Sequence, residues 1–170
     1  MTPVKAFTLI PEQTDKALVY DKPGEISTKI ETLETPKPGV NEVLINLTHS
    51  GVCHSDQAVM CNRWTWLPAP TQAGQVGGHE GVGTVVAFGP GAEDVGLKIG
   101  QRVGIKWIAY ACGNCLPCMH GRDACCTSAK ISGFYTPGTF QRTCTSSSSL
   151  GSMTSLLLCF PMCSNSHEHH

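Results

Sequence analysis

Charged residues are scarce in this sequence, at 15% of its 170 positions, and the formal net charge at pH 7 is only -1. A chain so close to neutral offers no basic surface for nucleic acid or for an anionic membrane. No apolar run approaches the roughly 18 residues that cross a bilayer, and the opening MTPVKAFTLIPEQTD lacks the apolar stretch of a secretory signal. These absences predict a cytoplasmic protein with neither nucleic-acid nor membrane partners.

Helical periodicity is also rare, whereas strand-like patterns recur. Hydrophobic residues, at 41%, suffice for one globular domain at this length. The only clear helical stretch is SDQAVMCN, residues 55–62, with Ser55 as its expected cap. The 18 glycines and 11 prolines favour turns, so we expect a mostly β, barrel-like domain. Its predicted strands lie at 4–9, 16–20, 25–33, 42–52, 81–91 and 101–110, the first two forming a hairpin.

The composition changes near Arg142. The last 28 residues hold eight serines, one acidic residue and no lysine or arginine, which is typical of a segment that cannot build a core. We therefore expect one domain at residues 1–143 and a low-complexity, disordered tail at residues 144–170.

Cysteine, in contrast, is abundant: there are ten, and five of them lie in ACGNCLPCMHGRDACC, residues 111–126. Cys112, Cys115 and Cys118 are spaced three apart, and Cys126 follows eight residues later. In a reducing compartment such clusters bind metal more often than they form disulfides. Four thiolates at about 2.3 Å satisfy tetrahedral zinc and leave no open position. The spacing therefore predicts a structural zinc in a lobe at about residues 108–131.

Two alternatives to this assignment stay open. Cys125 is adjacent to Cys126, so the two side chains are not expected to face one ion, and Cys125 is the substitute fourth ligand. The thiols could instead be free or redox-active. The sequence lacks the βαβ pattern of a thioredoxin-like device, which argues against the redox interpretation.

A second set of candidate ligands lies upstream, in SGVCHSD (residues 50–56) and GGHEG (residues 77–81). Cys53 and His79 each sit on a glycine-flanked turn after a predicted strand. A lone histidine is more often a hydrogen-bonded structural residue than a ligand. Beside a four-cysteine lobe, however, the two together indicate a second metal site.

The segments GVCHSD, GGHEGVGTVV, GIKW and CGNCLPCMHGRDACC, in this order and spacing, resemble the catalytic domain of zinc-dependent medium-chain alcohol dehydrogenases of the fungal type. The resemblance runs from about Val4 to Gln141. It implies a GroES-like β domain with one catalytic and one structural zinc. It also implies oxidation of a small alcohol to an aldehyde or ketone, with hydride passing to NAD.

Carried over by position, the resemblance assigns Cys53 and His79 as ligands of the catalytic zinc. Glu80 becomes a nearby carboxylate that can exchange onto the metal. Asp56 becomes the partner that orients the His79 imidazole. Ser55 becomes the hydroxyl that hydrogen-bonds the substrate oxygen and passes its proton on.

Three further positions follow from the same resemblance. His54 would meet the pyrophosphate of the cofactor. Trp64 and Trp107 would line the alcohol pocket, although simple core packing is nearly as good an explanation of either tryptophan.

The sequence departs from the family pattern at several points. The family relays its proton through a histidine where this chain has Ala58. The segment that would carry the third catalytic cysteine is missing; Cys159 and Cys163 are weak substitutes because they fall early and lack the Ala-Gly turn. No glycine-rich phosphate turn opens a helix, so a Rossmann domain is expected to be absent from these 170 residues.

These departures lead to two functional hypotheses. The first is the zinc-binding catalytic domain of an NAD-dependent alcohol dehydrogenase, inactive in a truncated or frame-altered form that changes after Arg142. The alternative is a non-enzymatic, zinc-binding truncated isoform. In either case we expect a monomer or weak self-association.

Overall fold

The computed structural model describes residues 14–94, 96–147 and 156–158. Its first element is a hairpin of β1 (Thr14–Tyr20) and β2 (Thr28–Glu34), paired antiparallel from end to end. The other edge of β1 bridges to Val76 and Gln141. Residues 4–9, expected to pair with 16–20, lie outside the described residues. Among the described residues, β2 is the hairpin partner of β1.

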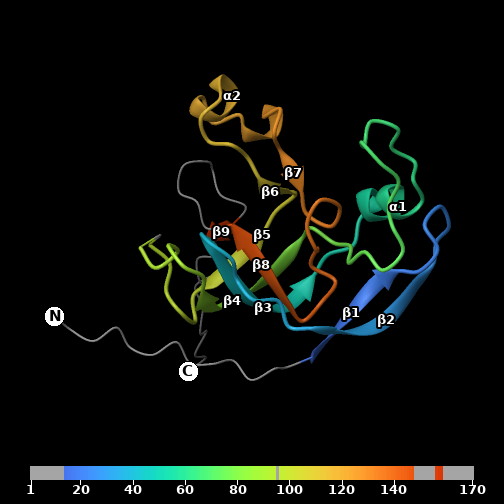
Figure 1. The fold of residues 1–170 in the computed structure, drawn as a ribbon, viewed down its shortest axis with the longest axis horizontal. Helices are drawn as coiled ribbons and strands as arrows, with labels where there is room; N and C mark the ends of the chain where they lie inside the picture. Colours follow the sequence, from blue (N-terminus) through green and yellow to red (C-terminus); the bar gives the residue numbers. More distant parts are fainter. Residues whose placement is uncertain (1–13, 95, 148–155, 159–170) are drawn as a thin grey trace, which may run out of the picture.

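The centre of the fold is a five-stranded antiparallel sheet in the order β8-β3-β4-β5-β9 (Figure 1). Side chains two positions apart along a strand point to the same face of this sheet. They form a core of Val43, Ile45, Val85, Val103 and Cys144. The strands are β3 (Glu42–Ser50), β4 (Gly81–Phe88), β5 (Arg102–Ile105), β8 (Thr143–Ser147) and β9 (Leu156–Leu158).

The prediction of a mostly β, GroES-like fold is confirmed, but the described strands do not close into a barrel. β8 and β9 stand at opposite edges of the sheet and do not pair with each other. The expected boundary after residue 143 also falls inside a strand. β8 pairs with β3 and buries Cys144, so residues 144–147 belong to the sheet rather than to an unstructured tail.

The N-cap of helix α1 (His54–Met60) lies two residues earlier than expected, because it is Cys53 and not Ser55. The Cys53 sulfur accepts from the backbone N–H of Ser55, and the Asp56 carboxylate accepts from the N–H of Cys53. Each residue thus satisfies a donor that the start of a helix would leave unpaired. A cysteine takes the role that the sequence suggested for a serine.

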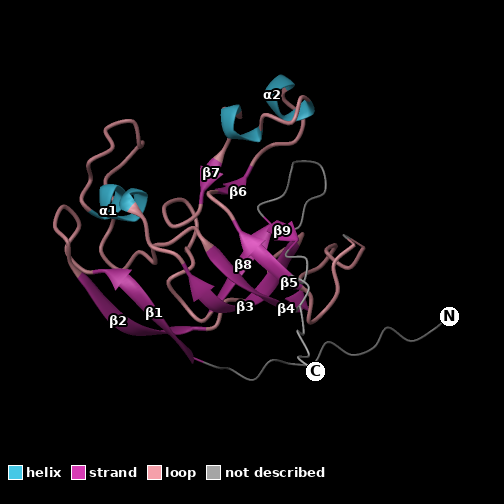
Figure 2. Ribbon diagram, turned by 180° about the vertical axis from the view of Figure 1, so that it is seen from behind, coloured by secondary structure: helices cyan, strands magenta, loops and turns pink. Residues whose placement is uncertain are grey.

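A small lobe stands away from the sheet and from the β1–β2 hairpin in both ribbon views (Figures 1 and 2). Cys118, Cys126 and Ile131 are buried in its core. Its elements are β6 (Ile108–Tyr110), α2 (Leu116–Met119), the 3-10 turn η1 (Asp123–Cys125) and β7 (Lys130–Ile131), with β6 and β7 paired antiparallel. Within the described ranges, no helix is long and apolar enough to cross a membrane.

Candidate metal centres

The lobe gathers the four cysteines that the spacing selected: Cys112, Cys115, Cys118 and Cys126. Their sulfur atoms lie within 4.8 Å of one another. The Cys112 and Cys118 sulfurs are 3.9 Å apart, and those of Cys126 and Cys112 are 3.6 Å apart. Tetrahedral zinc with bonds of about 2.3 Å separates its sulfurs by about 3.8 Å. The donor set therefore fits a zinc ion, and all four cysteines are free thiols.

The surroundings of the lobe cysteines shift the pKa values of Cys112 and Cys118 in opposite directions. Hydrogen bonds from the N–H groups of Asn114 and Cys115 lower the pKa of Cys112 to about 6, which favours the thiolate that binds metals. Burial raises the pKa of Cys118 to about 12, so this sulfur needs a neighbouring cation to ionise near neutral pH. Cys125 is exposed and stands outside the cluster.

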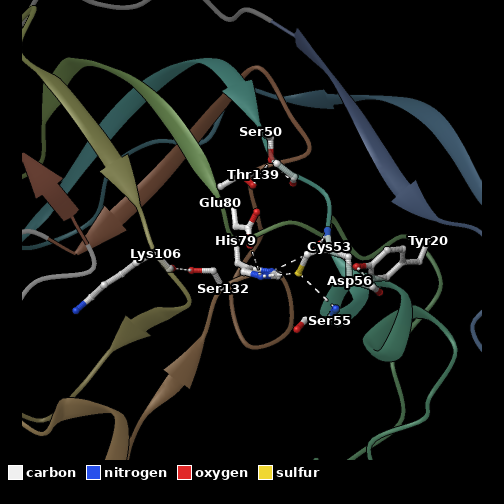
Figure 3. Close-up of polar contacts among 12 residues, drawn as sticks. Tyr20, Ser50, Cys53, Ser55, Asp56, His79, Glu80, Lys106, Ser132 and Thr139 are labelled. Carbon is white, nitrogen blue, oxygen red and sulfur yellow. Dashed lines mark hydrogen bonds and ion pairs between the residues drawn. The ribbon is translucent and has the colours of Figure 1, made fainter. Parts of the chain in front are cut away.

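Cys53, His79 and Glu80 form the second group of donors (Figure 3). The Cys53 sulfur lies 3.5 Å from His79 Nε2, and Glu80 Oε1 lies 3.6 Å from the same nitrogen. A sulfur and an imidazole nitrogen sharing one tetrahedral zinc are separated by about 3.6 Å. Three donors from two turns thus meet at the spacing that a single ion requires.

Asp56 orients two of these three donors. Its carboxylate accepts from the Cys53 N–H at 2.8 Å and contacts His79 Nδ1 at 3.1 Å. The latter contact assigns the ring proton to Nδ1 and leaves the lone pair of Nε2 for a metal. Burial would raise the pKa of Asp56, but the hydrogen bonds from His79 and Cys53 outweigh it and hold the pKa below its usual value.

Gly77 and Gly78, which precede His79, allow this turn to pack closely against neighbouring side chains. A Cβ on Gly77 would clash with the Tyr20 hydroxyl. A Cβ on Gly78, whose φ is 92°, would lie 2.5 Å from the Thr139 hydroxyl. The Tyr20 hydroxyl also donates to the Asp56 carbonyl at 3.4 Å. Tyr20 and Thr139 were missed by sequence reasoning, because only the tertiary fold brings them to GGHEG.

A cleft of about 760 Å³ opens above the second donor group. Ser55 lines it together with both predicted tryptophans, Trp64 and Trp107. The Trp107 ring packs edge-on against the His79 imidazole, with centroids 4.7 Å apart and planes at 80°. The wall of the cleft and the candidate ligand are therefore in direct contact.

The two remaining predicted positions lie apart from the cleft. His54, the first residue of α1, is exposed. Ala58 is fully buried, so the position where the family carries its relay histidine faces the core here. Cys159 and Cys163 lie outside the described residues.

A family model described as the alcohol dehydrogenase GroES-like domain matches residues 39–152. Alcohol dehydrogenase 2 of Emericella nidulans is 65% identical over 127 residues, covering 75% of this chain and 35% of that protein. An alcohol dehydrogenase of Schizosaccharomyces pombe is 39% identical over 135 residues, covering 79% and 37%. The chain therefore spans about a third of the length of these curated relatives.

The fold comparison agrees. The cobalt- and zinc-bound thermostable alcohol dehydrogenase of Pyrobaculum aerophilum superposes with a TM-score of 0.68 at 28% identity, covering 79% of this chain and 40% of that one. The resemblance read from GVCHSD, GGHEG and the cysteine lobe is thereby confirmed. The chain belongs to the alcohol dehydrogenase GroES-like domain family, as the N-terminal domain of the fungal zinc-dependent type.

Proposed function

We propose that the chain forms the zinc-binding catalytic part of an NAD-dependent alcohol dehydrogenase that converts small primary or secondary alcohols to aldehydes or ketones. The observation that carries this proposal is the convergence of the Cys53 sulfur, His79 Nε2 and the Glu80 carboxylate at the cleft. Zinc held there would supply a Lewis acid that lowers the pKa of an alcohol hydroxyl.

The protein's own residues would orient the substrate and carry its proton. Asp56 keeps the His79 ring in its ligating tautomer, and Trp107 packs against that ring in a T-shaped arrangement. Ser55, which lines the cleft, would accept the hydrogen bond of the alcohol and pass the proton to solvent. Because Ala58 is buried, the onward relay would run through water in the open cleft rather than through a histidine.

His54, exposed at the start of α1, would be available to the pyrophosphate of NAD. Across residues 14–94, 96–147 and 156–158, however, no glycine-rich turn opens a helix after a strand, the arrangement that holds a dinucleotide. We therefore expect the 170 residues, assayed by themselves, to bind zinc and to show no NAD-dependent alcohol oxidation. We also expect them to be monomeric or only weakly associated.

A second candidate function is that of a non-enzymatic zinc-binding module. It is favoured by the four-cysteine lobe, whose donor set is complete within residues 112–126. Four thiolates leave zinc no open position, so this centre would stabilise the lobe and perform no chemistry.

A chimera distinguishes the two functions. Residues 1–147, which keep β8 intact, would be joined to the cofactor domain of the Emericella nidulans relative. Alcohol-dependent NADH formation that Cys53→Ala abolishes, with lobe zinc retained, supports the dehydrogenase. A chimera that holds zinc at both centres and binds NAD, yet oxidises no small alcohol, would contradict it and favour the zinc-binding module.

A further inference from the structure

Lys106 lines the cleft but has no part in the function proposed above, and its side chain points toward the lobe. Its Nζ lies 2.8 Å from Asp123 Oδ2, and both side chains are largely buried, at 24% and 15% exposure. Asp123 opens η1, between the third and fourth cysteines of the cluster, and its carbonyl accepts from the N–H of Cys126. One ion pair thus joins the wall of the cleft to the segment that delivers Cys126.

The backbone beside Lys106 is held by the lobe as well. Ser132, which follows β7 and is buried, donates through its hydroxyl to the Lys106 carbonyl at 3.0 Å. The N–H of Ser132 donates to the Trp107 carbonyl at 2.9 Å. Three interactions therefore fix residues 106 and 107: the ion pair of the Lys106 side chain, and a hydrogen bond from Ser132 to each of the two main-chain carbonyls.

Trp107 is the residue through which this attachment reaches the candidate catalytic centre. On one side its ring packs with the buried core of the lobe, which includes Cys118 and Cys126. It also packs against the His79 imidazole in a T-shaped arrangement. A displacement of Trp107 would both reshape the cleft and remove a packing contact from a candidate metal ligand.

We propose that Lys106 and Asp123 are positioning residues, and that their ion pair holds Trp107 against His79 only while the four-cysteine lobe is folded around its metal. The lobe then controls the geometry of the cleft without touching substrate. This inference rests on the proposed metal centres, but its central claim concerns the position of Trp107. A partly buried pair of this kind contributes more than an exposed one, because water and salt screen it less.

The test uses the 170-residue chain labelled with 5-fluorotryptophan, with the three fluorine signals assigned by single Trp→Phe variants. Lys106→Met and Asp123→Asn should each shift or broaden the Trp107 signal. Each should also weaken zinc binding at the cleft about three- to tenfold, measured by competition with a chromophoric chelator, while lobe zinc is retained. Asp123→Glu should restore both readouts, and the double variant should be no worse than either single variant.

Glu31→Gln is the matched control, because it breaks a Lys29–Glu31 pair of the same 2.8 Å length on the distant β1–β2 hairpin. The proposal is overturned if Lys106→Met and Asp123→Asn both keep the Trp107 fluorine signal and the zinc affinity of the cleft that the control variant shows. If Asp123→Asn loses the zinc of the lobe, the test rests on Lys106→Met, because Lys106 lies outside the lobe. If the wild-type cleft binds no zinc, the proposed function fails, and the fluorine signal still decides the role of the pair.

Discussion

At the scale of single residues, Asp56 is the side chain on which the cleft depends most, because one carboxylate holds the backbone of Cys53 and the ring of His79. Asp56→Asn keeps the size of the side chain but removes its charge and one acceptor. We expect cleft zinc affinity to fall about 10- to 100-fold, with lobe zinc unchanged. Competition titration with a chelator measures this, and an unchanged affinity would contradict the assigned role.

Gly78 provides a second test at this scale. An alanine there would have to adopt a φ of 92° and would drive its Cβ into Thr139 and Phe140. Gly100, with φ of 83° and nothing within 4 Å, carries the same backbone strain in open space. We expect Gly100→Ala to cost about 1–2 kcal/mol and Gly78→Ala clearly more, with loss of cleft metal. Urea unfolding of both variants measures the difference; equal costs would show that the turn has room to move.

At the scale of elements, the lobe has only a small core, and we expect a zinc ion on its four cysteines to hold it together. Its elements are short, and two of its buried residues are themselves cysteines. Cys118→Ser should remove one tightly bound zinc and unfold the lobe, since structural zinc contributes folding free energy directly. Cys125→Ser, at the exposed neighbour, should leave the zinc content at wild-type level. Metal analysis of reduced protein checks both, and loss of zinc in the second variant would reassign the fourth ligand.

Strand β8 gives the other element-scale prediction. Burial raises the pKa of Cys144 to about 12, well above its unfolded value near 9. Between these values the unfolded chain loses this proton and the folded chain keeps it, so stability falls as pH rises. We expect urea unfolding to show this loss above about pH 9 in the wild type. The contribution should be missing in Cys144→Ala and still present in Cys125→Ser. If the free energy of unfolding of Cys144→Ala kept the wild-type dependence on pH, the result would contradict the burial of Cys144 in the core.

At the scale of the whole molecule, the two centres differ in their number of thiolates, four against one. Soft sulfur ligands bind zinc more tightly than a mixed set with a carboxylate. Stepwise chelation should therefore remove cleft zinc first and lobe zinc last. Metal analysis after each step checks the order, and simultaneous loss would contradict it.

The candidate donors that the sequence singled out do come together in two groups, because cysteine and histidine spacing reflects local turns directly. The sequence predicted the supporting contacts poorly. Tyr20, Thr139 and Lys106 act through partners far along the chain, and no local pattern marks them. The sequence also misjudged residues 144–147: a Ser/Thr-rich segment looks polar in isolation, and only its backbone pairing with β3 makes it a sheet strand.

Cys53 serves at once as a helix cap and as a candidate ligand, and this double role sets the order in which the protein can mature. Its sulfur accepts a backbone hydrogen bond that forms with α1 itself, so this one donor is in position before any metal arrives. The lobe, in contrast, would acquire its shape together with the zinc ion proposed for its four cysteines. Zinc supply during synthesis would therefore decide whether the lobe folds, whereas zinc supply afterwards would decide whether the cleft is loaded.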